Sequence, residues 1–218
     1  MISPEGQERV LTRYSWGWCG EIDDLVRMPQ IAAHAFTWLR IDRRRIHSVG
    51  SSMGGQETLL LVARHPALLA GAAGLDSDTD MRARYYAFPE LRDGSRLQAL
   101  AQLEIGGTPT TVPNAYELRS PIYWAAAIAR SGVPLHIWWS TRDRIVRNQQ
   151  EESGRMFRAI QALHPRADVT QYVGTWAHSH EFRASARLPL ALLRLGLIKL
   201  TDKIPQPDTV TKEAGQTG

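Results

Sequence analysis

One short segment constrains the fold of this chain more than any other: residues 50–55, which read GSSMGG. The run before it, residues 46–49, favours a β-strand, and residues 56–64 have the apolar spacing of an α-helix. Glycines on both sides of the serine pair permit a very tight turn between the two. A strand, a tight turn and a helix in this order form the first half of a parallel βαβ unit.

The same alternation continues along the rest of the chain. Further strands are expected at residues 68–75, 133–140 and 169–173, and further helices at residues 21–39, 123–130, 145–163 and 183–200. The small apolar residues of the first of these strands are typical of a parallel strand that is buried on both faces. The sequence therefore predicts an α/β fold with a mostly parallel sheet and helices on both faces.

The length of 218 residues suits one domain with a core large enough to fold alone. Residues 1–200 carry all of the expected elements, whereas residues 201–218 are polar and include Pro205 and Pro207. We therefore expect one folded domain at residues 1–200 and a disordered tail at residues 201–218.

The net charge of +4 comes almost entirely from arginine, and residues 43–45 form the only tight arginine cluster. A cluster just before a strand is typical of a solvated turn, so no nucleic-acid partner is expected. No apolar run is long enough to span a membrane, and residues 1–9 lack a signal-peptide core. These features predict a cytoplasmic protein without a membrane partner, and the single Cys19 excludes an internal disulfide.

Ser52 is the centre of a G-x-S-x-G pattern between a strand and a helix, which is the context of a nucleophile elbow. Such a turn is strained, so its flanking positions must be small. The helix N-terminus that follows directs its dipole and free amides toward the serine, and the amide of Met53 is the expected oxyanion donor. An ordinary serine in a glycine-rich turn is the alternative.

A serine nucleophile needs a base and an acid that orients the base, and in this type of fold they follow in the order serine, acid, histidine. Asp143 comes shortly after one expected strand, and His178 comes shortly after the next. A doubly wound sheet places its active site beyond the carboxyl ends of its strands. Ser52, Asp143 and His178 are therefore the predicted catalytic residues.

Other residues compete for these roles. Asp76 and Asp78 follow another expected strand and are rival acids, while His180 is a rival base. Asp143 would also suit a helix N-cap, where aspartate is favoured. His178 is preferred to His180 because of its distance from the glycine-led turn that follows the strand.

Trp176 lies on the loop that carries His178 and is the best candidate for a substrate-binding side chain. His178, His180 and Glu181 would form a short set of metal ligands, but no second cluster matches it, so no metal is expected. The sequence also lacks a phosphate-loop pattern, and no cofactor is implied.

Four segments occur in one ordered series: GSSMGG at 50–55, RSPI at 119–122, PLHIWWSTRD at 134–143 and GTWAH at 174–178. Together they resemble the catalytic domain of prolyl oligopeptidase-type α/β-hydrolases and their esterase relatives, over roughly residues 22–197. The resemblance implies an α/β-hydrolase catalytic domain at residues 1–200, with Ser52 as nucleophile, Asp143 as acid and His178 as base.

The resemblance also implies several strands before the elbow, whereas only a short stretch precedes Ser52. Residues 14–20 resemble the glycine-rich loop that follows the last of those strands, so the N-terminal strands are expected to be missing or minimal. The loop that supplies a second oxyanion donor would be lost with them. Any secretion signal would be lost too, which makes secretion the alternative localisation. The exposed sheet edge would favour self-association, so a homo-oligomer is a hypothesis.

These features predict a serine hydrolase that cleaves carboxylic esters through an acyl-enzyme on Ser52, with a small-molecule ester as the expected partner. The alternative is a prolyl oligopeptidase-like serine peptidase that acts on peptides. The alternative from another class is a truncated, non-catalytic hydrolase-like protein, because a missing oxyanion donor costs roughly 10²–10³ in rate.

Overall fold

The computed structural model describes residues 14–183 and 188–199. Its sheet has four parallel strands, and their order in the sheet is their order in the chain: β1 (His47–Ser51), β2 (Gly71–Leu75), β3 (Leu135–Ser140) and β4 (Val169–Gly174). Gly50 pairs with Gly74 in the register of β1 and β2, so both strands end at the same level. The prediction of an α/β fold with a parallel sheet is confirmed.

Helices connect the strands and flank them. The α-helices are α2 (Cys19–Ala35), α3 (Met53–Arg64), α4 (Met81–Ala87), α5 (Gly94–Ile105), α6 (Pro113–Leu118), α7 (Ala125–Ala129), α8 (Ser153–Leu163), α9 (His180–Arg183) and α10 (Leu188–Arg194). Short 3₁₀ turns are η1 (Arg43–Arg45), η2 (Pro66–Leu68), η3 (Phe88–Glu90) and η4 (Pro121–Trp124). Among the described residues, no helix is long and apolar enough to cross a membrane.

Apolar side chains are buried on both faces of the sheet. On one face, α3, α7 and α8 cover β2 and β3 through a core that includes Leu59, Ile128 and Met156. On the other face, α10 packs against Trp138 through Ala191. The central strand β2 is buried at every position and its sequence is a continuous run of small apolar residues, whereas β4 is mostly exposed.

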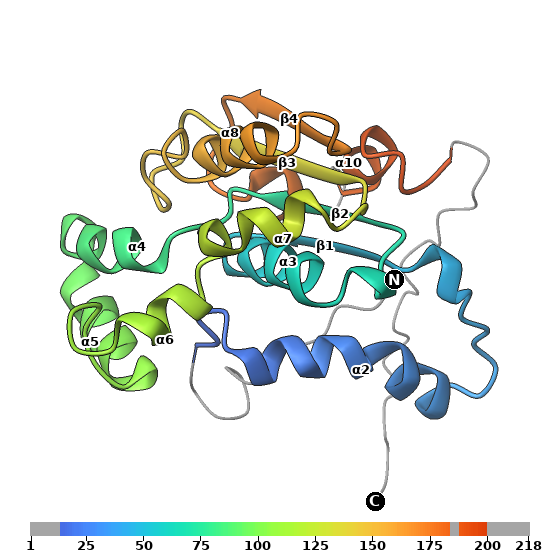
Figure 1. The fold of residues 1–218 in the computed structure, drawn as a ribbon, viewed down its shortest axis with the longest axis horizontal. Helices are drawn as coiled ribbons and strands as arrows, with labels where there is room; N and C mark the ends of the chain where they lie inside the picture. The colour runs from blue at the N-terminus through green and yellow to red at the C-terminus, as the bar shows by residue number, and fades with distance from the viewer. Residues whose placement is uncertain (1–13, 184–187, 200–218) are drawn as a thin grey trace, which may run out of the picture.

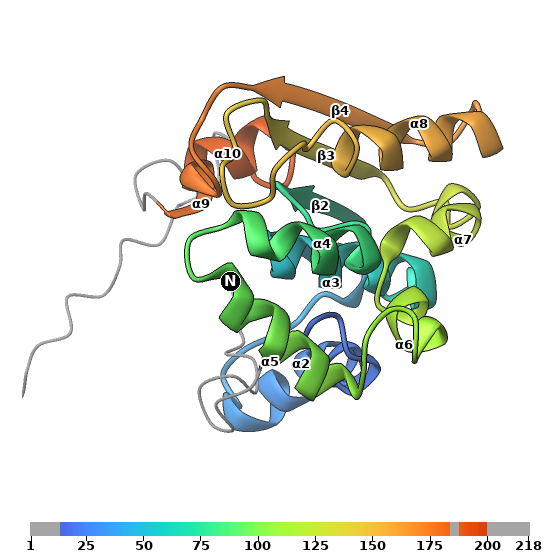
Figure 2. The ribbon, with the colours of Figure 1, turned by 90° about the vertical axis from the view of Figure 1, so that its left-hand side faces the viewer.

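The long connection between β2 and β3 forms a separate group of helices. Figure 1 shows α4, α5 and α6 together at the left of the molecule, away from α10. They enclose an apolar cluster of Met81, Tyr85, Phe88 and Tyr116, to which Trp16 contributes its ring. Figure 2 shows α5 and α2 on the side of the molecule opposite β4.

Several expected helices are shorter than predicted, and two differ most in their bounds. The segment predicted as a helix from residue 145 becomes helical only at Ser153, because the side chain of Asp143 accepts the amides of Ile145 and Val146 and turns the chain. The segment predicted at 183–200 contains the end of α9 and α10, with residues 184–187 and 200 outside the described part. The predicted tail at 201–218 also lies outside it.

Candidate active site

Ser52 occupies a strained turn between β1 and α3. Its backbone angles are φ 58° and ψ −126°, a conformation that non-glycine residues rarely adopt. The Ser52 amide donates to the carbonyl of Leu75 at 2.8 Å, which fixes the turn to the end of β2. The turn therefore holds Ser52 at the carboxyl edge of the sheet, at the N-terminus of α3.

Two of the glycines around Ser52 are required by close contacts. A Cβ on Gly50 would lie 2.1 Å from the carbonyl oxygen of Gly54, and one on Gly55 would lie 2.2 Å from the hydroxyl of Ser77. A Cβ on Gly54 would meet nothing within 4 Å. The expectation that all flanking positions must be small is therefore correct at 50 and wrong at 54.

The amide of Met53 belongs to the first turn of α3, where amides lack acceptors within the helix. Its side chain is held from the other side, because the Met53 sulfur accepts the amide of Trp16 at 3.3 Å. Met53 thereby joins the elbow to the apolar cluster of α4 to α6.

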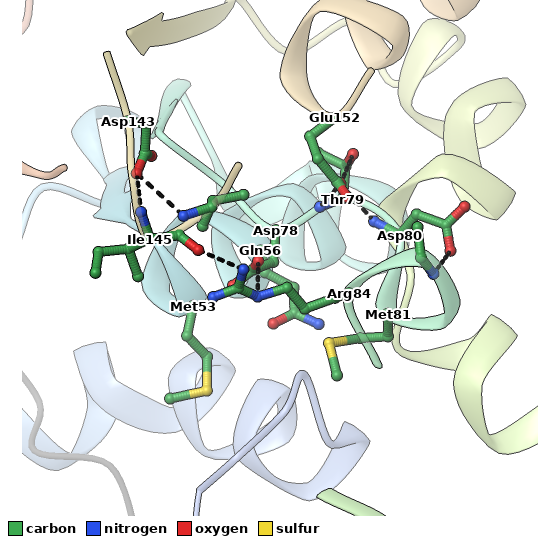
Figure 3. Close-up of polar contacts among 12 residues, drawn as sticks. Met53, Gln56, Asp78, Thr79, Asp80, Met81, Arg84, Asp143, Ile145 and Glu152 are labelled. Carbon is green, nitrogen blue, oxygen red and sulfur yellow. Dashed lines mark hydrogen bonds and ion pairs between the residues drawn. The ribbon is translucent and has the colours of Figure 1, made fainter. Parts of the chain in front are cut away.

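Asp143 and His178 form a buried pair. The Nδ1 atom of His178 lies 2.7 Å from Oδ2 of Asp143, although the two residues are separated by a strand and a helix. Oδ1 of Asp143 accepts the amides of Ile145 at 2.8 Å and Val146 at 3.0 Å, and Gln149 donates to Oδ2 at 3.2 Å. Figure 3 shows Asp143 facing the amide of Ile145.

The environment of Asp143 favours its ionised form. Burial by itself would raise the pKa of this carboxyl, but the hydrogen bond and charge of His178, with the donors Ile145 and Gln149, hold the pKa below its ordinary value. An ionised acid against Nδ1 leaves Nε2 of His178 as the nitrogen that can accept a proton.

A hydrogen bond joins two of the three predicted catalytic residues, Asp143 and His178. Within residues 14–183, the hydroxyl of Ser52 makes no side-chain hydrogen bond, to His178 or to any other residue. Contacts between nucleophile and base are often longer before substrate binds. His180, the rival base, is exposed at the first position of α9, whereas His178 is buried.

The rival acids have other partners. Asp76 is buried and accepts hydrogen bonds from Ser140, Trp176 and Ser179. Asp78 is paired with Arg84 at 3.0 Å, and burial raises the pKa of both aspartates. Neither hydrogen-bonds His178 in the described structure, so Asp143 is the acid that the geometry favours.

Asp76, Asp143 and His178 each offer a ligand atom within 4.8 Å of the others, the one such group of metal-binding residue types in the described residues. Each of these side chains already has protein hydrogen-bond partners. A metal ion would have to displace those partners, so the group fits an acid–base arrangement better than an ion site.

Trp176 is half-buried, and its ring stacks on Tyr172 with the centroids 5.7 Å apart. Its indole N–H donates to Oδ2 of Asp76 at 2.8 Å. These contacts brace the loop that carries His178. A role of Trp176 in substrate binding stays a prediction.

Arg84 and Glu152 are buried near the site, and no sequence pattern pointed to either. Arg84 pairs with Asp78 and donates to the carbonyl of Ile145, while Glu152 accepts the amides of Thr79 at 2.8 Å and Asp80 at 2.9 Å. Figure 3 shows this series of contacts running from Asp143 through Ile145 and Arg84 to Asp78. Arg84 lies in a helix that no motif marks, and Glu152 lay inside a helix predicted to be continuous.

Solved structures share this arrangement of strands and helices. An acylaminoacyl peptidase of Pyrococcus horikoshii matches with a TM-score of 0.62 and 18% identity, over 81% of this chain and 26% of that chain. A puromycin-hydrolysing peptidase of Mycobacterium tuberculosis matches with a TM-score of 0.61 and 22% identity, over 81% of this chain and 24% of that chain. Dipeptidyl peptidase 4 of Porphyromonas gingivalis matches with a TM-score of 0.55 and 20% identity, over 80% and 22%.

The chain therefore spans about a quarter of the length of the peptidases it matches. No protein-family profile and no curated protein matches the sequence. With its parallel sheet, its helices on both faces and these neighbours, the chain has the α/β-hydrolase fold.

Proposed function

We propose that the chain is a serine hydrolase with Ser52 as nucleophile, His178 as general base and Asp143 as the residue that orients His178. The observation that carries the proposal is the buried 2.7 Å contact between His178 and Asp143, at the same carboxyl edge of the sheet as the strained turn of Ser52. A histidine held through Nδ1 by an ionised acid is the arrangement that activates a serine hydroxyl.

In the proposed reaction, Nε2 of His178 takes the proton of the Ser52 hydroxyl while Oγ forms a bond to the substrate carbonyl carbon. The amide of Met53 donates to the oxyanion that develops. His178 then gives its proton to the leaving group as the bond to that group breaks, which leaves an acyl group on Ser52. Water, activated by the same histidine, releases the acid.

A carboxylic ester is the proposed substrate. Resonance makes a peptide carbonyl less electrophilic than an ester carbonyl, so attack on an ester needs less transition-state stabilisation, and the Met53 amide is the one donor identified in the described elbow. A peptide substrate is the second candidate, and it is supported by the names of the matching structures, which are peptidases.

The test compares the purified chain with Ser52→Ala, and uses Ser51→Ala as the matched control because Ser51 is the neighbouring serine in the same segment. Hydrolysis of short p-nitrophenyl esters, cleavage of peptide p-nitroanilides and labelling by a fluorophosphonate are measured. Activity and labelling that disappear only with Ser52→Ala support the proposal, and the substrate series separates ester from peptide. A folded chain that neither labels nor hydrolyses is a non-catalytic relative, and the proposal is then wrong.

A further inference from the structure

The carboxylate of Asp76 joins three segments that lie far apart in the sequence. Its Oδ1 accepts the amide of Ser140 at 3.0 Å, and its Oδ2 accepts the indole N–H of Trp176 and the amide of Ser179, both at 2.8 Å. Asp76 is fully buried, so water does not compete for these hydrogen bonds. Because all three partners are donors, an acceptor-only carboxylate fits the position and a carboxamide does not.

Two of these donors lie on either side of His178. Trp176 precedes the histidine and Ser179 follows it, and both donate to the same oxygen of Asp76. The hydroxyl of Ser140 also donates to the carbonyl of Trp176, so the loop is fixed at both its backbone and its side chain. The position of the His178 ring therefore depends on a residue that does not touch the ring through a hydrogen bond.

Backbone strain occurs at both ends of this link. Asp76 has a φ of 45° and Ser179 a φ of 55°, both in the left-handed region that residues other than glycine rarely occupy. Such conformations are unfavourable and persist where the surroundings over-determine them. The hydrogen bond from the Ser179 amide to the carboxylate of Asp76 joins these two strained residues.

Several charged groups surround His178. Asp143 contacts its Nδ1, Asp76 lies within 4.8 Å of this pair through its nearest ligand atom, and Asp78 lies nearby with its partner Arg84. Asp76 and Asp143 therefore both lie beside the imidazole, and only Asp143 hydrogen-bonds it in the described structure.

We propose that Asp76 is a positioning residue for the catalytic base, which it holds against Asp143 through Trp176 and Ser179. The proposal rests on the proposed role of His178, but its structural part concerns only where the imidazole is held.

The test uses Asp76→Asn in the full chain, with Trp176→Phe as a milder variant that keeps the ring and loses only the indole N–H. The first readout is the downfield proton NMR signal of the His178 Nδ1–H in its bond to Asp143, which is assigned by its disappearance in His178→Gln. We expect this signal to broaden or vanish in Asp76→Asn and to weaken in Trp176→Phe. The second readout is ester hydrolysis, where kcat falls by about 10²-fold at a nearly unchanged KM because the base is displaced.

The matched control is Glu152→Gln. Glu152 is another buried carboxylate that accepts three hydrogen bonds, from the amide and hydroxyl of Thr79 and the amide of Asp80, but it does not contact the His178 loop. We expect Glu152→Gln to keep both the NMR signal and the wild-type kcat. A double variant of Asp76 and Trp176 should lose less than the sum of its parts, because both changes break the same link.

The outcomes separate the two proposals. If the wild-type chain hydrolyses esters and Asp76→Asn keeps the signal and kcat, the positioning role is wrong and the proposed function stands. An equal loss in Glu152→Gln would also overturn the positioning role, since it would reflect general loosening. If the wild-type chain has no activity but the signal depends on Asp76, the proposed function is wrong and Asp76 still holds His178.

Discussion

One carboxylate oxygen of Asp143 accepts a hydrogen bond from the imidazole of His178. The other oxygen accepts the backbone amides of Ile145 and Val146. The acid is thus oriented by its own loop before it orients the histidine. A carboxamide at this position would keep one acceptor but would present a donor to either the amides or the imidazole.

For this reason we expect Asp143→Asn to be far less active than the wild type. A comparable change in a serine protease triad costs about 10⁴ in kcat, because the histidine takes the wrong tautomer. Rates of p-nitrophenyl ester hydrolysis and of fluorophosphonate labelling measure the loss. An Asp143→Asn chain that labels as fast as the wild type would assign the acid to another residue, with Asp76 the first to examine.

Gly50 and Gly54 should respond to alanine in opposite ways. Gly50→Ala places a methyl group 2.1 Å from a backbone oxygen, so the turn must open and the chain should lose several kcal/mol of stability or fail to fold. Gly54→Ala meets no atom within 4 Å, and as a helix residue it should gain up to about 1 kcal/mol. Urea unfolding of both variants, followed by circular dichroism, decides the comparison. Equal losses in the two variants would contradict it.

The Arg84–Asp78 pair should matter for stability more than surface ion pairs do. Both side chains are buried, so Arg84→Met leaves an acid without its partner and should cost roughly 3–5 kcal/mol. Adding Asp78→Asn to Arg84→Met should recover part of the loss, because the uncompensated acid is removed. Arg147→Met, at an exposed pair with Glu90, is the matched control and should change stability by less than about 1 kcal/mol. A similar loss at both sites in chemical unfolding would refute the distinction.

Glu152 should make the stability of the chain depend on pH. Burial, followed by the charge of Asp78, raises the pKa of Glu152 from 4.5 to about 7. The folded state therefore binds a proton that the unfolded state has released between these values, so stability is full below about pH 4.5 and falls as the pH rises toward 7. Glu152→Gln should flatten this part of the profile, because its amide oxygen can still accept from Thr79 and Asp80. Melting temperatures recorded from pH 4.5 to 8 test this, and identical slopes in the two chains would contradict it.

The sequence predicted the strands and the main residues of the candidate site because both depend on local pattern and chain order. Ser52 is marked by its glycines, Asp143 follows a plainly apolar strand, and His178 follows a strand rich in β-branched and aromatic residues. In a parallel sheet such positions meet at one edge, so their proximity follows from topology alone.

The start of α8 and the partners of Asp76 and Trp176 depend on contacts that no local sequence pattern encodes. The apolar spacing from residue 145 predicted a continuous helix, but one side chain, Asp143, captures the amides that the helix would need. Asp76 resembled a rival acid because it follows a strand, and its three donors come from residues 64 to 103 positions away. Trp176 was identified by its place on the loop, whereas its contact with Asp76 required the fold.

The strands lie in the sheet in the order in which they are made: β1, β2, β3, then β4. Each of the later strands therefore pairs with the one just before it in the chain. Ser52 is placed with the first strand, Asp76 with the second, Asp143 with the third and His178 only after the fourth. The buried His178–Asp143 contact thus needs the carboxyl ends of both β3 and β4, so a chain cut before β4 would keep its serine and its acid but lack its base.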